Sequence, residues 1–436
     1  MAQTMTPIEF AGLPSKDALM KEFGGKALTS LRTPAFVLDR SIFERNCSSM
    51  ASKTKEWGAG FRAHLKTHKT VEGARLQLRG KTKAIVVSTI MEAWHVVNSG
   101  LVADSTVNDI LYGLPIAINK IQDLSKLQEK IKQYGGSVKL LIDHPDQIAA
   151  LEEQAGPREE WRVFVKIDGG QRRAGVSPNS PLFKTILSKI FESKIVVVHG
   201  FYSHAGDSYG STSNEEASRF LTSEVEAANE AAKIALSMLK NDDLASAKYS
   251  DPFVLSVGST PTAHVASAET RARLGKELHG KLELHAGNYP ILDLQQLHTK
   301  LISPDHIAHR VLSTVISYYP GRGQDGSDEA LCDAGAIAMS KDTGPSGGFG
   351  EVVGRPWRLG RISQEHGILT QRKDVAAGVG VSEPSTDASL KIGEQIKIVG
   401  QHACLIAAAH PWYYIVDSSQ GKADVVVDVW VPWKGW

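Results

Sequence analysis

The sequence predicts a protein of class α/β plus β, in which a (β/α)8 barrel of the TIM type precedes a mostly β domain. Up to about residue 290, short valine- and isoleucine-rich runs are separated by helical patterns, which is typical of parallel strands buried on both faces. After that point long helical patterns become scarce, and valine-rich strands alternate with Gly/Pro turns. The length of 436 residues exceeds one ordinary core and favours two domains.

Eight strand and helix units account for the first part of the chain. The clearest helical pattern covers 213–240, where Ser213 and Glu216 have capping-box spacing and apolar residues recur three and four apart. The barrel strands are expected at 61–67, 83–89, 103–109, 137–143, 162–168, 194–204, 251–258 and 281–287. Repeated strand, helix, strand segments imply parallel βα units, and eight of them suggest a closed barrel.

We therefore predict an N-terminal extension over residues 1–33, the barrel over 34–289 and the β domain over 290–436. The strand at 34–39 precedes the barrel and can belong to either domain. The polar stretch at 371–391 is expected to be an excursion on the surface.

Charge and composition exclude several classes of function. The 49 basic and 48 acidic residues nearly cancel, so no nucleic acid partner is expected. No apolar run approaches a membrane span, and the first residues lack a signal-peptide pattern. The cysteines (Cys47, Cys332 and Cys404) are few and far apart, which favours a reducing compartment over a disulfide framework. We expect a cytoplasmic protein.

Unusual residues gather where the predicted barrel strands end. In a TIM barrel the loops after the strands form the face that carries the active site. Lys66, Asp168 and His204 end three of these strands, and turns rich in glycine and hydroxyl groups end the last two. Turn chemistry explains each of them separately, but their occurrence on one face favours a functional site.

Two of these strand ends suggest pyridoxal phosphate. Backbone N–H groups beside Gly258, together with the hydroxyls of Ser259 and Thr260, can bind a phosphate, and the turn at 286–289 can add further backbone donors. Lys66 can supply the amine that forms a Schiff base with the cofactor. The phosphate signal alone is weak because Ser/Thr/Gly turns are common.

A second candidate site lies in the β domain. His402 and Cys404 are two residues apart, so on a strand both side chains face the same side. Imidazole and thiolate together favour zinc over magnesium or calcium. The pair supplies only two ligands, and a buried strand with a small thiol and one hydrogen-bonded histidine explains the spacing equally well. If zinc binds, its site is open, as a Lewis-acid role requires.

Seven segments occur in an order that resembles a known family. They are RAHLKTHK, KIDGGQRRAG, GFYSHAGDSYG, SVGSTPT, ELHAGNY, SQEHG and HAC. The chain resembles the eukaryotic-type D-serine dehydratases and the related D-threonine aldolases, which are fold-type III pyridoxal phosphate enzymes with an alanine racemase-like barrel and a β domain. The resemblance runs from about residue 30 to the C-terminus, and HLKTHK and HAC are its most specific parts.

The resemblance implies a role for each matching position. Lys66 would carry pyridoxal 5'-phosphate, and Arg173 would lie near the phenolic oxygen of the cofactor. The zinc ligands would be His402 and Cys404. Further cofactor contacts would come from His204, Tyr209, Gly258, Ser259, Thr260, Gly287 and Asn288. A homodimer and a small D-amino acid substrate are expected on the same ground.

The implied activity is the conversion of D-serine to pyruvate and ammonia. Lys66 would remove the α-proton, and zinc would assist the loss of the β-hydroxyl. Alternatives are a D-threonine aldolase, a dehydratase of another 3-hydroxy D-amino acid such as 3-hydroxyaspartate, an amino-acid racemase and a noncatalytic pyridoxal phosphate carrier. Cys404 favours the dehydratase over the aldolase, because the aldolases tend to carry a carboxylate there. A racemase needs no metal, and a carrier resembles the barrel alone.

Two details stay open at this point. His366 can be an acid or base that faces the substrate, or an ordinary turn histidine. The cationic neighbours of Lys66 can lower its pKa or serve packing alone; they are Arg62, His64, His68 and Lys69.

Overall fold

The computed structural model describes residues 5–436 apart from 155, 157–159, 241–248, 250–251, 275–276, 374–378 and 380–388. Most of the polar stretch predicted at 371–391 lies outside the described residues. The chain divides into two units, the first made of 1–12, 49–287 and 433–436, and the second of 13–48 and 288–432. Within the described residues, no helix is long and apolar enough to cross a membrane.

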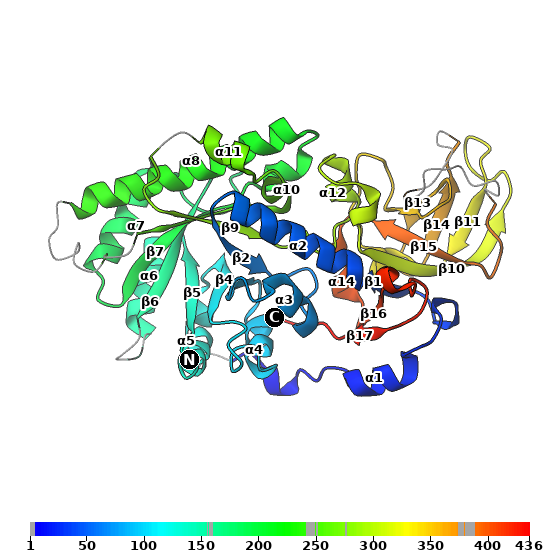
Figure 1. The fold of residues 1–436 in the computed structure, drawn as a ribbon, viewed down its shortest axis with the longest axis horizontal. Helices are drawn as coiled ribbons and strands as arrows, with labels where there is room; N and C mark the ends of the chain where they lie inside the picture. The colour runs from blue at the N-terminus through cyan, green and yellow to red at the C-terminus, as the bar shows by residue number, and fades with distance from the viewer. Residues whose placement is uncertain are drawn as a thin grey trace. The chain divides into compact units, whose positions relative to one another are not determined.

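The first unit contains the predicted barrel, whose eight parallel strands close in chain order (Figure 1). They are β2 (Gly60–His64), β3 (Ala84–Val87), β4 (Asp109–Pro115), β5 (Ser137–Ile142), β6 (Trp161–Ile167), β7 (Val196–Ser203), β8 (Val254–Val257) and β9 (Lys281–Ala286). The strand predicted at 103–109 is wrong, because only Asp109 of that segment belongs to β4. The buried residues of β4 are Ile110, Leu111 and Tyr112, which follow the polar segment 103–109.

Helices alternate with the barrel strands. They are α3 (Val71–Leu78), α4 (Ile90–Asn98), α5 (Ile121–Lys132), α6 (Pro145–Gln154), α7 (Pro181–Glu192), α8 (Asn214–Leu239), α10 (Thr260–His264) and α11 (Ala268–Arg273). The start of α8 is confirmed, since the Ser213 hydroxyl accepts the Glu216 N–H at 3.2 Å. A stripe of buried small side chains, which includes Ala228, Ala231 and Ala235, lets this helix pack closely on the barrel.

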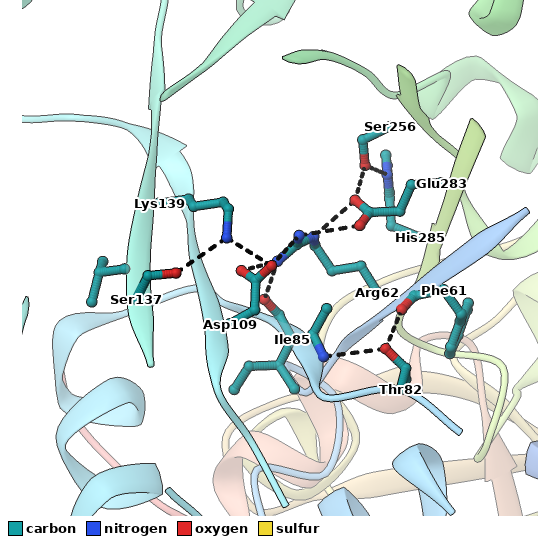
Figure 2. Close-up of polar contacts among 12 residues, drawn as sticks. Phe61, Arg62, Thr82, Ile85, Asp109, Ser137, Lys139, Ser256, Glu283 and His285 are labelled. Carbon is teal, nitrogen blue, oxygen red and sulfur yellow. Dashed lines mark hydrogen bonds and ion pairs between the residues drawn. The ribbon is translucent and has the colours of Figure 1, made fainter. Parts of the chain in front are cut away.

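Charged side chains fill part of the barrel interior (Figure 2). Arg62 is 1% exposed and lies between two carboxylates, with Nη1 at 2.7 Å from Asp109 Oδ1 and Nε at 2.8 Å from Glu283 Oε1. Lys139 Nζ is 2.7 Å from Asp109 Oδ2, and the Ser256 hydroxyl donates to Glu283 Oε1 at 2.8 Å. Two cations therefore balance two carboxylates, which is the condition under which buried charges are tolerated.

The second unit is the predicted β domain, a nine-stranded sheet in the order β11-β14-β13-β12-β15-β10-β1-β16-β17. β10 also pairs with β11, so the strands from β11 to β10 close on themselves. The strands are β1 (Ala35–Asp39), β10 (His309–Tyr319), β11 (Glu329–Cys332), β12 (Gly350–Val352), β13 (Trp357–Ile362), β14 (Gly367–Gln371), β15 (Gln395–Gly400), β16 (Tyr413–Val416) and β17 (Asp428–Trp430). The combination of barrel and β domain confirms the predicted fold class.

The early strand belongs to the second unit. β1 pairs antiparallel with β10 and parallel with β16, so the predicted start of the barrel at residue 34 differs from the observed division. All five residues of β1 are buried, and an unbroken apolar run of this kind does not reveal which sheet it joins. The helix α2 (Arg40–Glu56) then contains the boundary between the units.

Candidate active site

The carboxyl ends of the barrel strands hold most of the predicted cofactor residues. Lys66 lies in the turn two residues after β2 ends, and His204 directly follows β7. Gly258 directly follows β8, and Gly287 directly follows β9. Because all the strands are parallel, these residues share one end of the barrel, as predicted.

Lys66 and Gly287 approach each other at this end. A Cβ atom added at Gly287 would lie 3.4 Å from Lys66 Cε and 3.2 Å from His64 Cβ. The Thr67 hydroxyl donates to the Gly287 carbonyl at 3.2 Å, which ties the turn after β2 to the end of β9. Glycine at 287 thus leaves room for the lysine side chain beside it.

The basic segment around Lys66 is not a cluster of positive charges. Burial lowers the pKa of His68 to about 4, and the ring accepts the Thr70 N–H and donates to Gln77. Burial also holds the pKa of His64 well below its ordinary value, and Lys69 pairs with Glu92 at 3.0 Å. The charge of Arg62 is balanced by two carboxylates inside the barrel, so these neighbours take part in packing and ion pairs in this structure.

The turn after β8 is shaped by its glycine. Gly258 has φ of +139°, and a Cβ atom there would lie 2.2 Å from the His285 carbonyl oxygen. Ser259 then caps α10, since its hydroxyl accepts the Thr262 N–H at 3.2 Å and its own N–H donates to Thr262 Oγ1 at 2.8 Å. Ser259 and Thr260 are both buried. The turn is tight and rich in hydroxyl groups, as predicted.

The N–H groups of this turn are used differently from the prediction. The Gly258 N–H donates to Glu224 at 3.3 Å, and the Ser259 N–H is engaged by Thr262. The Ser259 hydroxyl lies 2.7 Å from that of Ser208. The hydroxyls of Ser208, Ser259 and Thr262 thus form one hydrogen-bonded group in this turn.

Aromatic rings line the same end of the barrel. His204 donates from Nδ1 to the Gly258 carbonyl at 2.7 Å, and its ring centroid lies 6.4 Å from that of Tyr209. Burial and then the charge of Arg173 lower the pKa of His204 to about 3, so the imidazole is neutral. Tyr202 and His285 stack with ring centroids 4.0 Å apart. Of these rings His204 and Tyr209 are partly exposed, and they can present flat faces to a planar ligand.

Arg173 lies in the exposed loop after β6. The loop is anchored by Asp168, whose Oδ1 accepts the N–H groups of Gly170 and Arg172 at 3.0 Å. The Arg173 charge lowers the pKa of both His204 and Lys166, so its electrostatic effect reaches the end of the barrel. Its predicted contact with the cofactor ring stays a prediction.

Sequence reasoning missed four residues of this site. Tyr202 and His285 lie two residues before His204 and Gly287, and the alternation of strand side chains could have identified them. Lys166 likewise lies two residues before Asp168, is buried and has a pKa lowered to about 8, mainly by burial. Glu224 lies on α8, and no sequence signal separates it from the other glutamates of that helix.

The second unit holds the predicted metal residues, in a local structure that differs from the prediction. β15 ends at Gly400, His402 is the N-cap of α14 (Ala403–Ala409), and Cys404 lies in the first turn of that helix. The prediction of a strand is wrong because Asp293 accepts the Ala403 N–H at 2.8 Å and so helps to start a helix. The two side chains nevertheless interact through a hydrogen bond.

Acidic groups surround His402. The Nδ1 atom of His402 donates to Asp342 Oδ2 at 2.7 Å. Asp293, the second acidic group, accepts a hydrogen bond from the side-chain amide of Asn288 at 2.6 Å. Burial lowers the pKa of His402, but the Cys404 side chain, Asp293 and Asp342 raise it to about 9. Within the described parts of the chain, no three His, Cys, Asp or Glu side chains form a group that could hold a metal ion.

His366 lies in the exposed turn between β13 and β14, which matches the turn interpretation.

Comparisons with known proteins agree with this architecture. The family model of the alanine racemase N-terminal domain matches residues 38–281, and that of the serine dehydratase domain matches 308–416. The D-serine dehydratase of Schizosaccharomyces pombe is 44% identical, covering 97% of this chain and 96% of its own. The D-serine dehydratase of Saccharomyces cerevisiae is 33% identical, covering 96% and 99%.

Solved structures show the same relationship. The D-threo-3-hydroxyaspartate dehydratase from Delftia sp. HT23 has a TM-score of 0.76 and 29% identity, covering 94% of this chain and all of its own. The fold alone is shared by several kinds of enzyme, but the sequence identity of 44% and 33% to two D-serine dehydratases extends over nearly the whole chain and indicates a single family. The chain belongs to the family of the eukaryotic D-serine dehydratases, which are lyases built on a barrel of the alanine racemase type.

Proposed function

We propose that this protein is a D-serine dehydratase that depends on pyridoxal phosphate and zinc and converts D-serine to pyruvate and ammonia. The observation that carries the proposal is Lys66, placed at the end of the barrel against Gly287, in a chain 44% identical to a D-serine dehydratase over 97% of its length. An amine at this end of an alanine racemase-type barrel is what a pyridoxal phosphate enzyme needs.

The residues at the end of the barrel fit the cofactor. A Cβ atom at position 258 would collide with the backbone, and one at position 287 would lie against His64 and Lys66, so glycine leaves space at both positions. The side chains of Ser259 and Thr260 can bind a phosphate. The neutral ring of His204 suits stacking on a planar ligand. When bound, pyridoxal phosphate supplies an electron sink for the electron pair left by removal of the α-proton.

Lys66 has two tasks in this account. Its amine holds the cofactor before the substrate arrives. With D-serine bound, the Nζ atom of Lys66 would be the base that accepts the α-proton of the substrate. Arg173, Tyr209, Gly287 and Asn288 remain proposed cofactor contacts. Loss of the β-hydroxyl and hydrolysis of the resulting enamine release pyruvate and ammonia.

The donor set at His402 fits a zinc ion. Asp342 accepts the Nδ1 proton of His402 at 2.7 Å, which leaves Nε2 as the nitrogen that can bind a metal. Cys404 adds a thiol, and two protein ligands leave open positions, as a catalytic ion requires. Such an ion would act as a Lewis acid toward the departing hydroxyl. These residues, His402 and Cys404, are the metal ligands that we propose.

A relative supports the metal. A cysteine-to-alanine mutant of a D-threo-3-hydroxyaspartate dehydratase has a solved structure in the metal-free form. The histidine and cysteine mutation sites in that enzyme are two residues apart, as His402 and Cys404 are here. The choice of zinc rests on the thiol. We also propose that the protein acts as a cytoplasmic homodimer; its three cysteines, all within the described residues, form no disulfide, which suits a reducing compartment.

A product assay with three substrates tests the proposal. Protein reconstituted with pyridoxal phosphate and zinc would receive D-serine, D-threo-3-hydroxyaspartate or D-threonine. We expect kcat/KM for pyruvate release from D-serine to be the highest. Faster release of oxaloacetate from the hydroxyaspartate would assign the protein to another dehydratase. Cleavage of D-threonine to glycine and acetaldehyde, without pyruvate from D-serine, would assign it to the aldolases.

A further inference from the structure

Glu224 is a buried carboxylate with no part in the function described above. It lies on α8, is 1% exposed, and sits behind the turn that follows β8. Its Oε1 accepts the N–H of Ala205 at 2.5 Å and that of Gly258 at 3.3 Å. One oxygen atom therefore joins the loop after β7 to the loop after β8, next to the hydrogen bond between His204 and the Gly258 carbonyl.

The second oxygen of Glu224 is unusual. Oε2 is buried and has no hydrogen bond of ordinary geometry among the described residues, although the Thr262 hydroxyl lies close enough to interact with the carboxyl group. A buried polar atom without a partner carries a substantial free-energy cost, so its retention needs a reason. A protonated carboxyl group would convert this oxygen from an acceptor into an O–H donor.

The surroundings of Glu224 favour the protonated form. Burial raises its pKa to about 7, while the N–H groups of Ala205 and Gly258, the Thr262 hydroxyl and Lys166 favour the charged form. Of these groups only Lys166 carries a charge, and burial lowers its pKa to about 8. Tyr202 also faces Glu224 and is uncharged, because burial raises its pKa strongly. Arg173, Asp168 and Asp143 act on Lys166 as Glu224 does, and Arg173 also acts on the neutral His204.

A phosphate bound at Ser259 and Thr260 would add negative charge close to Gly258. Glu224 contacts the Gly258 N–H, and the next residue, Ser259, is the proposed phosphate contact. A like charge nearby disfavours an ionised carboxylate, and the effect is strong where water is excluded. Either the phosphate binds more weakly while Glu224 is charged, or Glu224 takes up a proton when the phosphate binds.

We propose that Glu224 is a positioning residue of the phosphate site, which holds the loops after β7 and β8 together through Oε1 and takes up a proton when the cofactor phosphate binds. This inference rests on the proposed function, because it assumes that a phosphate occupies the turn at Gly258–Thr260. According to this inference, binding of the cofactor is coupled to the uptake of one proton by Glu224, and this proton takes no part in the chemical reaction. Glu224 would then be neutral in the enzyme with its cofactor.

The variant Glu224→Gln tests the inference. The amide oxygen can accept the same two N–H groups, and the amide N–H₂ imitates the protonated carboxyl, but the group cannot titrate. The affinity of the wild type for pyridoxal phosphate should therefore fall relative to that of E224Q, by up to about tenfold per pH unit above pH ~7. Affinity would be measured by absorbance titration between pH 6 and pH 9, a range that includes the pKa of Glu224, which is about 7.

Two controls isolate the phosphate. With pyridoxal, which lacks the phosphate, the difference between wild type and E224Q should vanish. Glu226→Gln changes an exposed glutamate of the same helix and should follow the wild type with both ligands. Titration calorimetry in buffers of different ionisation enthalpy measures how many protons the wild-type protein takes up when a ligand binds, so this test needs no variant. At pH 8 we expect greater uptake with pyridoxal phosphate than with pyridoxal.

The outcomes separate the two proposals. Equal pH dependence of wild type and E224Q, with normal binding of pyridoxal phosphate, would overturn the role of Glu224 and leave the proposed function intact. Equal proton uptake with both ligands in the wild type would do the same, even if E224Q failed to fold. No binding of pyridoxal phosphate to the wild type at any pH would overturn the proposed function as well.

Discussion

His204 donates its Nδ1 proton to the Gly258 carbonyl oxygen across 2.7 Å, and this bond fixes the tautomer of a buried imidazole. Burial keeps the ring neutral, and since its one proton is on Nδ1, Nε2 is an acceptor. The bond also joins the end of β7 to the turn after β8, which Glu224 joins a second time. The proposed ring face and the proposed phosphate turn are therefore parts of one connected structure.

Substitution of Gly258 should damage this structure directly. In Gly258→Ala the new Cβ would lie 2.2 Å from the His285 carbonyl oxygen, at a φ of +139° that alanine rarely adopts. We expect the affinity for pyridoxal phosphate to fall by about tenfold or more, together with a loss of about 1–3 kcal/mol in the free energy of unfolding. Absorbance titration and urea unfolding measure the two effects.

A matched glycine provides the control for that experiment. Gly12 has open space around its Cβ position and no positive φ, so Gly12→Ala should leave affinity and stability unchanged. Normal cofactor affinity in a folded Gly258→Ala protein would show that the turn at 258–260 is not the phosphate site.

Replacement of Lys66 should abolish the covalent link to the cofactor. Lys66→Ala should lack the absorbance band near 400–430 nm that we expect from a lysine Schiff base in the wild type, and pyruvate release should fall by about 10³-fold or more. Lys81→Ala removes an exposed lysine after α3 and should behave as the wild type. Borohydride reduction followed by peptide mapping would identify the modified lysine; a label on any other lysine would refute the assignment.

The carboxylate beside His402 should influence metal affinity. Asp342 accepts the Nδ1 proton of His402, and the loss of such a partner typically weakens metal binding about 10–100-fold. We therefore expect Asp342→Asn to lose zinc to a chelator at a lower chelator concentration, measured by competition with a zinc indicator. Asp146→Asn changes an exposed aspartate of α6 and serves as control. If D342N retained zinc as tightly as the control, Asp342 would have no part in the metal site.

His68 should make stability depend on pH. Its pKa is about 4 in the folded chain against an ordinary value of 6.5, so the unfolded chain takes up the proton first as pH falls. Its contribution to stability is complete above pH 6.5 and is lost between pH 6.5 and pH 4, to a total of about 3 kcal/mol.

The variant His68→Gln isolates this effect. Wild type and variant would be unfolded in urea at pH 7 and at pH 5, and the advantage of the wild type should shrink by about 2 kcal/mol at the lower pH. His144→Gln alters an exposed histidine and should show no such change in the difference. A constant difference between His68→Gln and wild type would mean that His68 does not titrate in this range.

Sequence patterns predicted the elements whose signals are local and failed where a tertiary contact decides. The cap at Ser213 follows from spacing and is confirmed, and the predicted strand ends at Lys66 and His204 are correct to within two residues, since β2 ends at His64 and β7 at Ser203. His402 instead caps a helix because Asp293, distant in sequence, accepts the Ala403 N–H. No pattern within 400–412 contains that information.

The charge state of the site was also beyond sequence reasoning. RAHLKTHK reads as a cationic segment, but burial neutralises His64 and His68, and carboxylates from β4 and β9 pair with Arg62. In the sequence Glu224 cannot be distinguished from the other glutamates of α8. In the structure it is the only described glutamate of that helix whose side chain accepts hydrogen bonds from the N–H groups of Ala205 and Gly258. Burial and partners determine the charge, and both are properties of the folded chain.

The most direct test of the account is pyruvate release from D-serine by protein reconstituted with pyridoxal phosphate. The assay would be repeated after treatment with EDTA and again after zinc is returned. We predict that pyruvate release disappears with the metal and recovers with zinc. Pyruvate release that persists at the full rate after all metal is removed would contradict the role of His402 and Cys404, and no pyruvate under any of these conditions would contradict the proposed function itself.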